Sequence, residues 1–345
     1  MNEKDNNETF VISNGSTITL DKLKAEFVEA KKNKQFAFIL GNGINRYNPN
    51  DLSWNNLLRE VWNKCLGNDC PMISEGITLT EIYDLMCLKY DDVSGKETDE
   101  HNKHTQEAWD KAKAKIRKVV KEKITSKLDY TAWLQNRLNS LKVPVLTTNY
   151  DTNIERKYKQ YVINSQLYSK GYSDTYLFNV YYAEKKLKQE DFFSEYSVWH
   201  INGSINHVRS IRIGTSDYMN LMAKTKFLLH DVAHLYNVNA KQHQWGIVKG
   251  QEIDSNYAFT WLDIFYNSSL CINGLALNSD ESYLRWLLIS RKKYLERVEL
   301  NDVKGWYVCH PSDLNDGKRL FLEGVGLDIV EIEDNKVRYE DLFDF

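Results

Sequence analysis

The sequence predicts an α/β fold with a mainly parallel sheet. Short apolar runs typical of buried strands alternate with longer segments in which apolar residues recur at helical spacing. The first two central runs, Phe36–Leu40 and Val143–Leu146, are separated by residues 41–142. A crossover between parallel strands needs only about a dozen residues. A folded insertion must therefore occupy this interval.

The insertion is expected to be helical over about residues 52–141. Helical periodicity is found in residues 52–66, 78–90, 108–128 and 132–141. The third of these segments is rich in lysine, but its lysines alternate with Ala, Ile and Val at core spacing, which favours a solvated helix face over a nucleic-acid surface. Because no Gly/Ser-rich linker is present, residues 36–345 are expected to form one domain that carries this insertion.

Residues 1–35 are expected to form an N-terminal extension. Two β-prone arms flank Asn14-Gly15 between Thr9 and Leu20, which is typical of a hairpin. A polar loop before a helix is the alternative interpretation. The periodicity of Leu20–Lys34 then predicts an amphipathic helix.

The segments after Asp151 continue the alternation. Strand-like runs are expected in residues 175–183, 196–203, 268–277, 305–310 and 327–333, and helices in 218–236 and 281–295.

Composition limits the class of protein. The net charge of -3, from 45 Lys+Arg against 48 Asp+Glu, gives no overall attraction to nucleic acid or anionic membrane. The N-terminus lacks the pattern of a signal peptide, and no apolar run approaches the length of a membrane span. Five scattered cysteines fit a reducing compartment. A cytoplasmic protein without a membrane partner is therefore expected.

Four polar or glycine-rich segments directly follow strand-like runs. They are Gly41-Asn42-Gly43, Thr147–Asp151, His200–Ser204 and Gly274–Asp280. If the strands are parallel, all four segments lie at one edge of the sheet, where α/β proteins bind their ligands. We therefore expect the functional site at this edge.

Each segment also has a purely structural interpretation. The glycines at 41 and 43 would let backbone amides approach a phosphate, although a tight turn without a ligand is the more frequent explanation of such a lone motif. Thr147–Asp151 supplies partners for sugar hydroxyls, or it is a strand-ending turn. His200 could accept a proton near neutral pH, or it could donate a hydrogen bond to a backbone carbonyl.

The order of these motifs resembles that of SIR2-like proteins, the bacterial relatives of sirtuins. The matching stretches are FILGNGIN, LSWNNLL, VLTTNYD, WHINGSI and INGLALNSDESYLRWLL, and the resemblance covers roughly residues 36–330. It implies a Rossmann-like NAD-binding domain with a helical insertion.

The resemblance also implies roles for individual residues. Asn149, His200 and Asp151 would be catalytic, with His200 as the base and the other two at the nicotinamide ribose. The residues expected to bind NAD are Gly41, Asn42, Gly43, Asn45, Thr147, Thr148, Gly203, Gly274, Leu275 and Asn278.

Departures from the sirtuin pattern narrow the expected activity. Sirtuin deacetylases carry a four-cysteine zinc module after the histidine motif, whereas this chain has only Cys271 between His200 and Gly274. We therefore expect no metal and no deacetylation. The resemblance instead points to an NAD+ hydrolase of bacterial anti-phage defence, which releases nicotinamide and ADP-ribose.

Gating is expected because an unregulated NAD+ hydrolase would deplete its own cell. The resemblance implies a homo-oligomer and a separately encoded defence partner, either an ATPase or a nucleic-acid-guided protein. The alternative is a non-catalytic sensor or assembly subunit that binds NAD or an ADP-ribose-type nucleotide. The sequence leaves open the trigger, the partner, the number of subunits and the acceptor, which could be water or another nucleophile.

Overall fold

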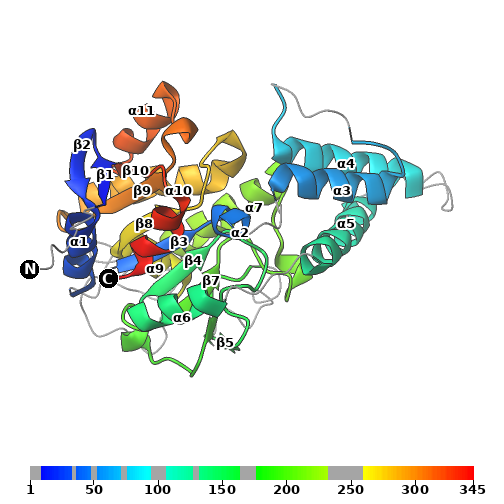
Figure 1. Cartoon of the computed structure of the whole chain (residues 1–345). Helices are drawn as coiled ribbons and strands as arrows, with labels where there is room; N and C mark the ends of the chain where they lie inside the picture. Colours follow the sequence, from blue (N-terminus) through cyan, green and yellow to red (C-terminus); the bar gives the residue numbers. More distant parts are fainter. Residues whose placement is uncertain are drawn as a thin grey trace, which may run out of the picture.

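A ten-stranded sheet organises the chain, with the order β2-β1-β10-β9-β8-β3-β4-β7-β6-β5 (Figure 1). The computed structural model describes residues 9–32, 36–47, 53–70, 76–94, 106–126, 132–163, 176–231 and 259–345. The strands are β1 Phe10–Ser13, β2 Ser16–Thr19, β3 Phe36–Leu40, β4 Pro144–Thr147, β5 Lys159–Val162, β6 Val180–Ala183, β7 Ser197–His200, β8 Ser269–Asn273, β9 Gly305–Cys309 and β10 Asp328–Glu331.

The six central strands, β7-β4-β3-β8-β9-β10, are parallel. Their chain order is third, second, first, fourth, fifth and sixth, which is the order of the Rossmann fold. The predicted α/β fold with a mainly parallel sheet is therefore confirmed. The order reverses between β3 and β8, which pair directly from Phe36 with Ser269 to Leu40 with Asn273.

Two apolar layers cover the two faces of the sheet. In β3, Ala37 and Ile39 belong to one core, while Phe36, Phe38 and Leu40 belong to the other, as the two-residue period of a strand requires. The first face is covered by α7 Thr215–Lys226, α9 Trp261–Asn267, α10 Ser282–Arg297 and α11 Asp316–Gly324. The second is covered by α1 Leu20–Lys32, α6 Ala132–Leu141 and α12 Asn335–Tyr339.

Three helices form a separate lobe, at the right of Figure 1. They are α3 Trp54–Leu66, α4 Leu79–Ser94 and α5 Gln106–Ser126. They share an apolar core to which Tyr150, Ile205, Ile211 and Ile213 also belong. Ser53 caps α3 by accepting a hydrogen bond from the amide of Asn56, and Gly67 ends it in the left-handed conformation. The fourth helix of the expected insertion, α6, packs on the sheet instead, through Leu134 and Leu138.

The N-terminal hairpin is present and joins the sheet. Asn14 and Gly15 both have positive φ, as a two-residue hairpin turn requires, and β1 pairs antiparallel with β10. The helix expected over Leu20–Lys34 is α1, and the last two residues of the expected range lie outside the described ranges. Residues 232–236 of the helix expected over 218–236 also lie outside them. Among the described helices, none has the length and apolar character needed to cross a membrane.

Candidate functional site

The loops after β3 and β8 meet at the point where the strand order reverses. The amide of Gly41 donates to the carbonyl of Asn273 at 3.0 Å, and the amide of Gly43 donates to that of Gly274 at 2.8 Å. A Cβ atom on Gly43 would lie 2.6 Å from the Cα of Gly274 and 2.5 Å from the hydroxyl of Tyr339. Glycine is therefore required at 43 for these two loops to pack together.

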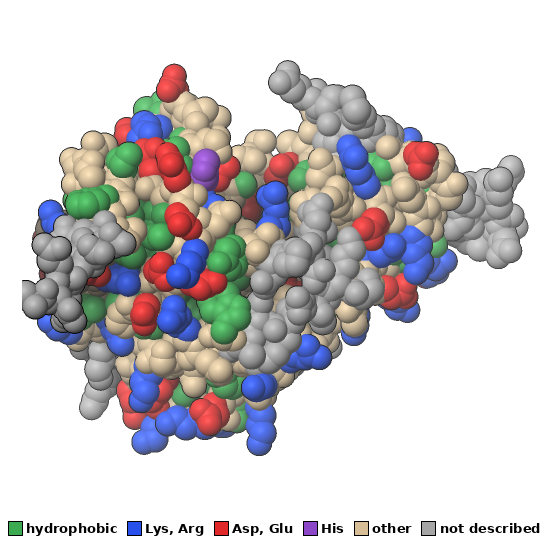
Figure 2. Space-filling view, viewed as in Figure 1, with side chains coloured by type: hydrophobic (Ala, Val, Ile, Leu, Met, Phe, Trp, Pro, Cys, Tyr) green, Lys and Arg blue, Asp and Glu red, His purple; other side chains and the backbone are tan. Residues whose placement is uncertain are grey.

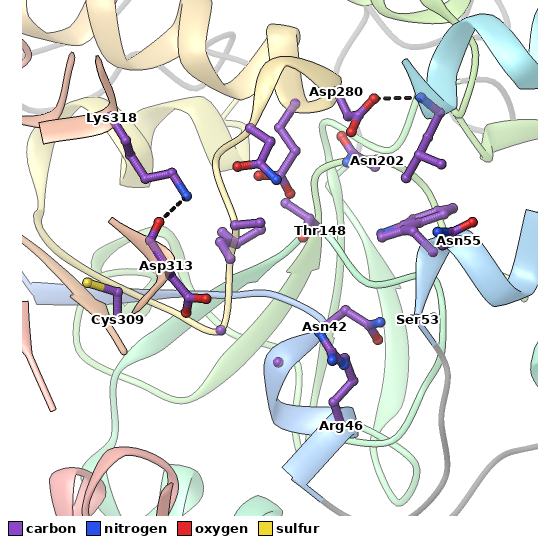
Figure 3. A pocket seen from close by; sticks show the side chains of 18 of the residues that line it. Asn42, Arg46, Ser53, Asn55, Thr148, Asn202, Asp280, Cys309, Asp313 and Lys318 are labelled. Carbon is purple, nitrogen blue, oxygen red and sulfur yellow. Dashed lines mark hydrogen bonds between the residues drawn. The ribbon is translucent and has the colours of Figure 1, made fainter. Parts of the chain in front are cut away.

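A cavity of about 520 Å³ opens at this junction (Figure 3). One wall comes from the sheet loops and the other from the first turns of α3 and α4, so the cavity lies between the sheet and the helical lobe. Figure 2 shows the surface indented between the lobe and the part of the molecule that carries α11. The lining residues include Asn42, Gly43, Arg46, Ser53, Trp54, Asn55, Leu58, Leu79, Thr80, Thr148, Asn202, Tyr218, Gly274, Leu275, Asn278, Asp280, Glu281, Cys309, Asp313, Lys318, Arg338 and Tyr339.

Six of the residues expected to bind NAD line this cavity. They come from three of the four predicted loops and are Asn42, Gly43, Thr148, Gly274, Leu275 and Asn278. The convergence expected from the sequence is present, because β3, β4, β7 and β8 are all parallel and their carboxyl ends lie at one edge.

The other four residues expected to bind NAD contact the backbone and side chains of the loops at this edge. Thr147 is buried and donates to the carbonyl of Leu40 at 2.9 Å. Gly203 has a φ of 96° and packs against the backbone of Ser210. Gly41 packs against Leu275, and Asn45 donates to the Asp151 carboxylate at 2.7 Å. None of these four is among the residues that line the described cavity.

Asn149 and Asp151 lie at a small side pocket that shares Asn42 and Trp54 with the main cavity. The half-buried Asn149 side chain donates to the carbonyl of Gly41 at 3.2 Å, which ties the β4 loop to the β3 loop. The second Asp151 oxygen accepts from the amide of Asn153 at 3.0 Å. Burial raises the pKa of Asp151, although these donors oppose the shift.

His200 lies beneath the β4 loop and is fully buried. Its Nδ1 is 2.8 Å from the carbonyl oxygen of Asn149, and its Nε2 is 2.8 Å from Oε1 of Glu155. A carbonyl can only accept, so Nδ1 carries a proton. Nε2 then either donates to an ionised Glu155 or accepts from a protonated one. In both cases no ring lone pair of His200 faces the cavity.

The pKa values of both members of this pair, His200 and Glu155, are raised. Burial opposes a charged imidazole, but the Glu155 carboxylate outweighs it and raises the pKa of His200. Burial also raises the pKa of Glu155, against the attraction of His200. Through Nδ1, His200 contacts the Asn149 backbone. The role of base that the resemblance implies for His200 stays a prediction.

Several cavity residues were not anticipated from the sequence. Arg338 is buried, and its Nε has no hydrogen-bond partner in the described part of the chain. Lys318 donates to the carbonyl of Asp313 at 2.7 Å and, with Arg46, adds positive charge to the lining. Of the missed residues, Asn202 had the clearest signal, because it lies in the HINGS motif beside His200.

Neither the search for metal sites nor the comparison with known proteins assigns a function to this site. Within the described ranges, no group of three or more His, Cys, Asp and Glu side chains could hold a metal ion. A scan against protein-family models finds no match, and a search of curated proteins finds no significant relative.

Proposed function

We propose that the chain is an NAD+ hydrolase that releases nicotinamide and ADP-ribose. The observation that carries this proposal is the cavity at the reversal point of a Rossmann-ordered sheet, where Gly43 and Gly274 bring two backbone loops into contact. This position is where doubly wound folds bind dinucleotides, and glycine backbone admits a pyrophosphate closely. Arg46, Lys318 and Arg338 supply positive charge for an anionic ligand.

Cleavage of the bond between nicotinamide and ribose requires few catalytic groups. The nicotinamide of NAD+ is a cationic pyridinium and leaves as a neutral molecule, so no general acid is required. The site has to hold the ribose, stabilise an oxocarbenium-like transition state and direct a nucleophile to C1′. We assign the contact with the ribose to Thr148, which lines the main cavity, and to Asn149, which lines the side pocket. We assign the stabilisation of positive charge to Asp151, which lines the side pocket together with Asn149.

The biological role follows from the SIR2-like motifs and remains part of the proposal. We propose that the hydrolase is an effector of anti-phage defence and that a homo-oligomer and a separately encoded partner gate it. The helical lobe offers a route for gating, because residues of α3 and α4 form one wall of the cavity. A shift of this lobe would change the shape of the site.

A second candidate function is a non-catalytic sensor that binds NAD or an ADP-ribose-type nucleotide. The specific observation in its favour is the burial of His200, which leaves the expected base without access to the cavity. Both functions need the glycine loops, but only the hydrolase needs an active nucleophile.

Product analysis separates the two candidates. The purified chain is incubated with NAD+, alone and with the product of its genomic neighbour, and the mixture is separated by chromatography. Nicotinamide and ADP-ribose are expected, with a higher rate when the neighbour is present. Asn149→Ala is expected to abolish cleavage while the protein stays folded, since Asn149 is only half-buried. Intact NAD+ with retained binding would support the sensor.

A further inference from the structure

Glu281 lines the cavity from the start of α10, on the loop that follows β8. Thr148, Asn202 and Tyr218 line the same cavity, and the amide of Asn202 is 3.5 Å from the Tyr218 hydroxyl. Glu281 and the end of the β4 loop therefore line one cavity.

One oxygen of Glu281 holds the β8 loop in place. Oε2 accepts the amide proton of Leu277 at 2.5 Å, and Arg285 donates to the carbonyl of the same residue at 2.8 Å. Leu277 has a φ of 48°, which is unfavourable for a leucine, so these two contacts stabilise a strained turn. Within the described part of the chain no side-chain or backbone group donates to the other oxygen, Oε1, and Glu281 lines the cavity.

The surroundings of this carboxyl group favour its protonated form. Burial raises the pKa of Glu281 to about 7, and Asp280 adds to the shift, while the Leu277 amide, Lys318 and Arg285 oppose it. Burial raises the pKa values of the phenols of Tyr218 and Tyr307, and the charge of Glu281 adds to both shifts. A carboxyl group that titrates near the working pH is suited to accept and release a proton.

We propose that Glu281 is the proton acceptor of the site, an inference that rests on the proposed hydrolase. Water attacks C1′ of the nicotinamide ribose, and the C1′–N1 bond breaks with its electron pair going to the pyridinium nitrogen. The attacking water transfers one proton to the Glu281 carboxylate, which later releases it to solvent. His200 has no free lone pair for this step, whereas Glu281 lines the cavity.

Glu281→Gln tests the proposal. Glutamine keeps an oxygen that can accept the Leu277 amide proton, so the loop and nucleotide binding are retained, but it cannot take up a proton. Turnover of NAD+ is expected to fall by about 10²-fold or more, because general bases contribute on this order. In the wild type kcat/KM should rise with pH up to about 7, and this rise should be absent from the residual activity of the variant. Glu296→Gln, an exposed glutamate on the same helix, is the matched control and should behave as wild type.

The outcomes distinguish the two proposals. Glu281→Gln with normal ADP-ribose binding in calorimetry and lost turnover supports Glu281 as proton acceptor. A variant that keeps both turnover and the rise with pH overturns that role and leaves the hydrolase intact. A variant that loses ADP-ribose binding together with turnover shows a role in loop structure alone and also overturns it. A wild type that cleaves no NAD+ with or without its partner overturns the hydrolase, and the proton acceptor with it.

Discussion

At the residue scale, the buried pair of His200 and Glu155 connects the β4 loop to the interior of the protein. His200→Ala would leave Glu155 buried without its partner, and its Oε2 already lacks a hydrogen bond within the described structure. Breaking a buried pair in this way costs about 3–5 kcal/mol. We expect denaturant unfolding to show a loss of this size. A loss below about 1 kcal/mol, the usual value of an exposed pair, would contradict the buried arrangement.

The same pair predicts how stability depends on pH. Both pKa values are raised in the folded state, above 4.5 for Glu155 and 6.5 for His200, so the folded form holds protons more tightly than the unfolded form. Stability should therefore fall as the pH rises through and above these values. Glu155→Gln removes one titrating group and its effect on the other, so its unfolding free energy should depend less on pH. Equal pH dependence in the two proteins would show that the pair does not titrate as described.

Gly43 provides a third test at this scale. In Gly43→Ala the new methyl group would overlap the Cα of Gly274 and the hydroxyl of Tyr339. Overpacking of this kind costs about 1–3 kcal/mol and moves the two loops apart, which should also weaken nucleotide binding. Gly324→Ala is the matched control, because no atom lies within 4 Å of its Cβ position. Thermal unfolding and ADP-ribose calorimetry should separate the two variants, and equal behaviour would contradict the close contact of the loops.

At the scale of elements, a buried charge network joins the helical lobe to the sheet domain. Asp217 of α7 contacts Lys113 at 3.1 Å and Arg117 at 2.9 Å, both on α5. Burial opposes ionisation of Asp217, but the two cations outweigh it and lower its pKa. The stabilisation is therefore present above the ordinary value of 3.8 and is lost as the pH falls through the lowered value. This network joins α5 of the lobe to α7 of the sheet domain.

Asp217→Asn should loosen the lobe, because it leaves two buried cations without their counter-charge. We expect a cost of about 3–5 kcal/mol and faster hydrogen exchange in α5. Glu107→Gln, which removes an exposed pair with Lys111 on the same helix, should leave stability close to that of the wild type. If both variants exchange at the wild-type rate, the network does not hold the lobe.

The elements also show how far the sequence could predict the structure. The central strands were predictable because uninterrupted apolar runs such as Phe36–Leu40 are typical of buried parallel strands. The edge strand β5 and the helices α9, α11 and α12 were missed because they are short. In addition, α9 is buried at nearly every position, so its sequence shows no amphipathic period. Local periodicity likewise could not separate α6, which packs on the sheet, from the helices of the lobe.

The candidate site was predictable in position and less so in detail. Glycines after strands and the order of the loops indicated the edge of the sheet at which the cavity opens. The burial of His200 depends on Glu155, 45 residues earlier, whose approach is set by the packing of the chain after β4. Glu281 gave no signal of its own, because its character arises from burial and from the charges around it.

At the scale of the whole molecule, the cavity lies between the helical lobe and the sheet, so a ligand should hold the two together. A ligand at a hundredfold excess over its Kd stabilises the folded state by about 2.7 kcal/mol if it binds only that state. ADP-ribose should therefore raise the unfolding free energy of the wild type, and hydrogen exchange should slow in the first turns of α3 and α4 as well as in the β3 and β8 loops. Gly43→Ala should lose both effects. Protection confined to the sheet loops would mean that the lobe takes no part in binding, and it would remove the basis for gating through α3 and α4.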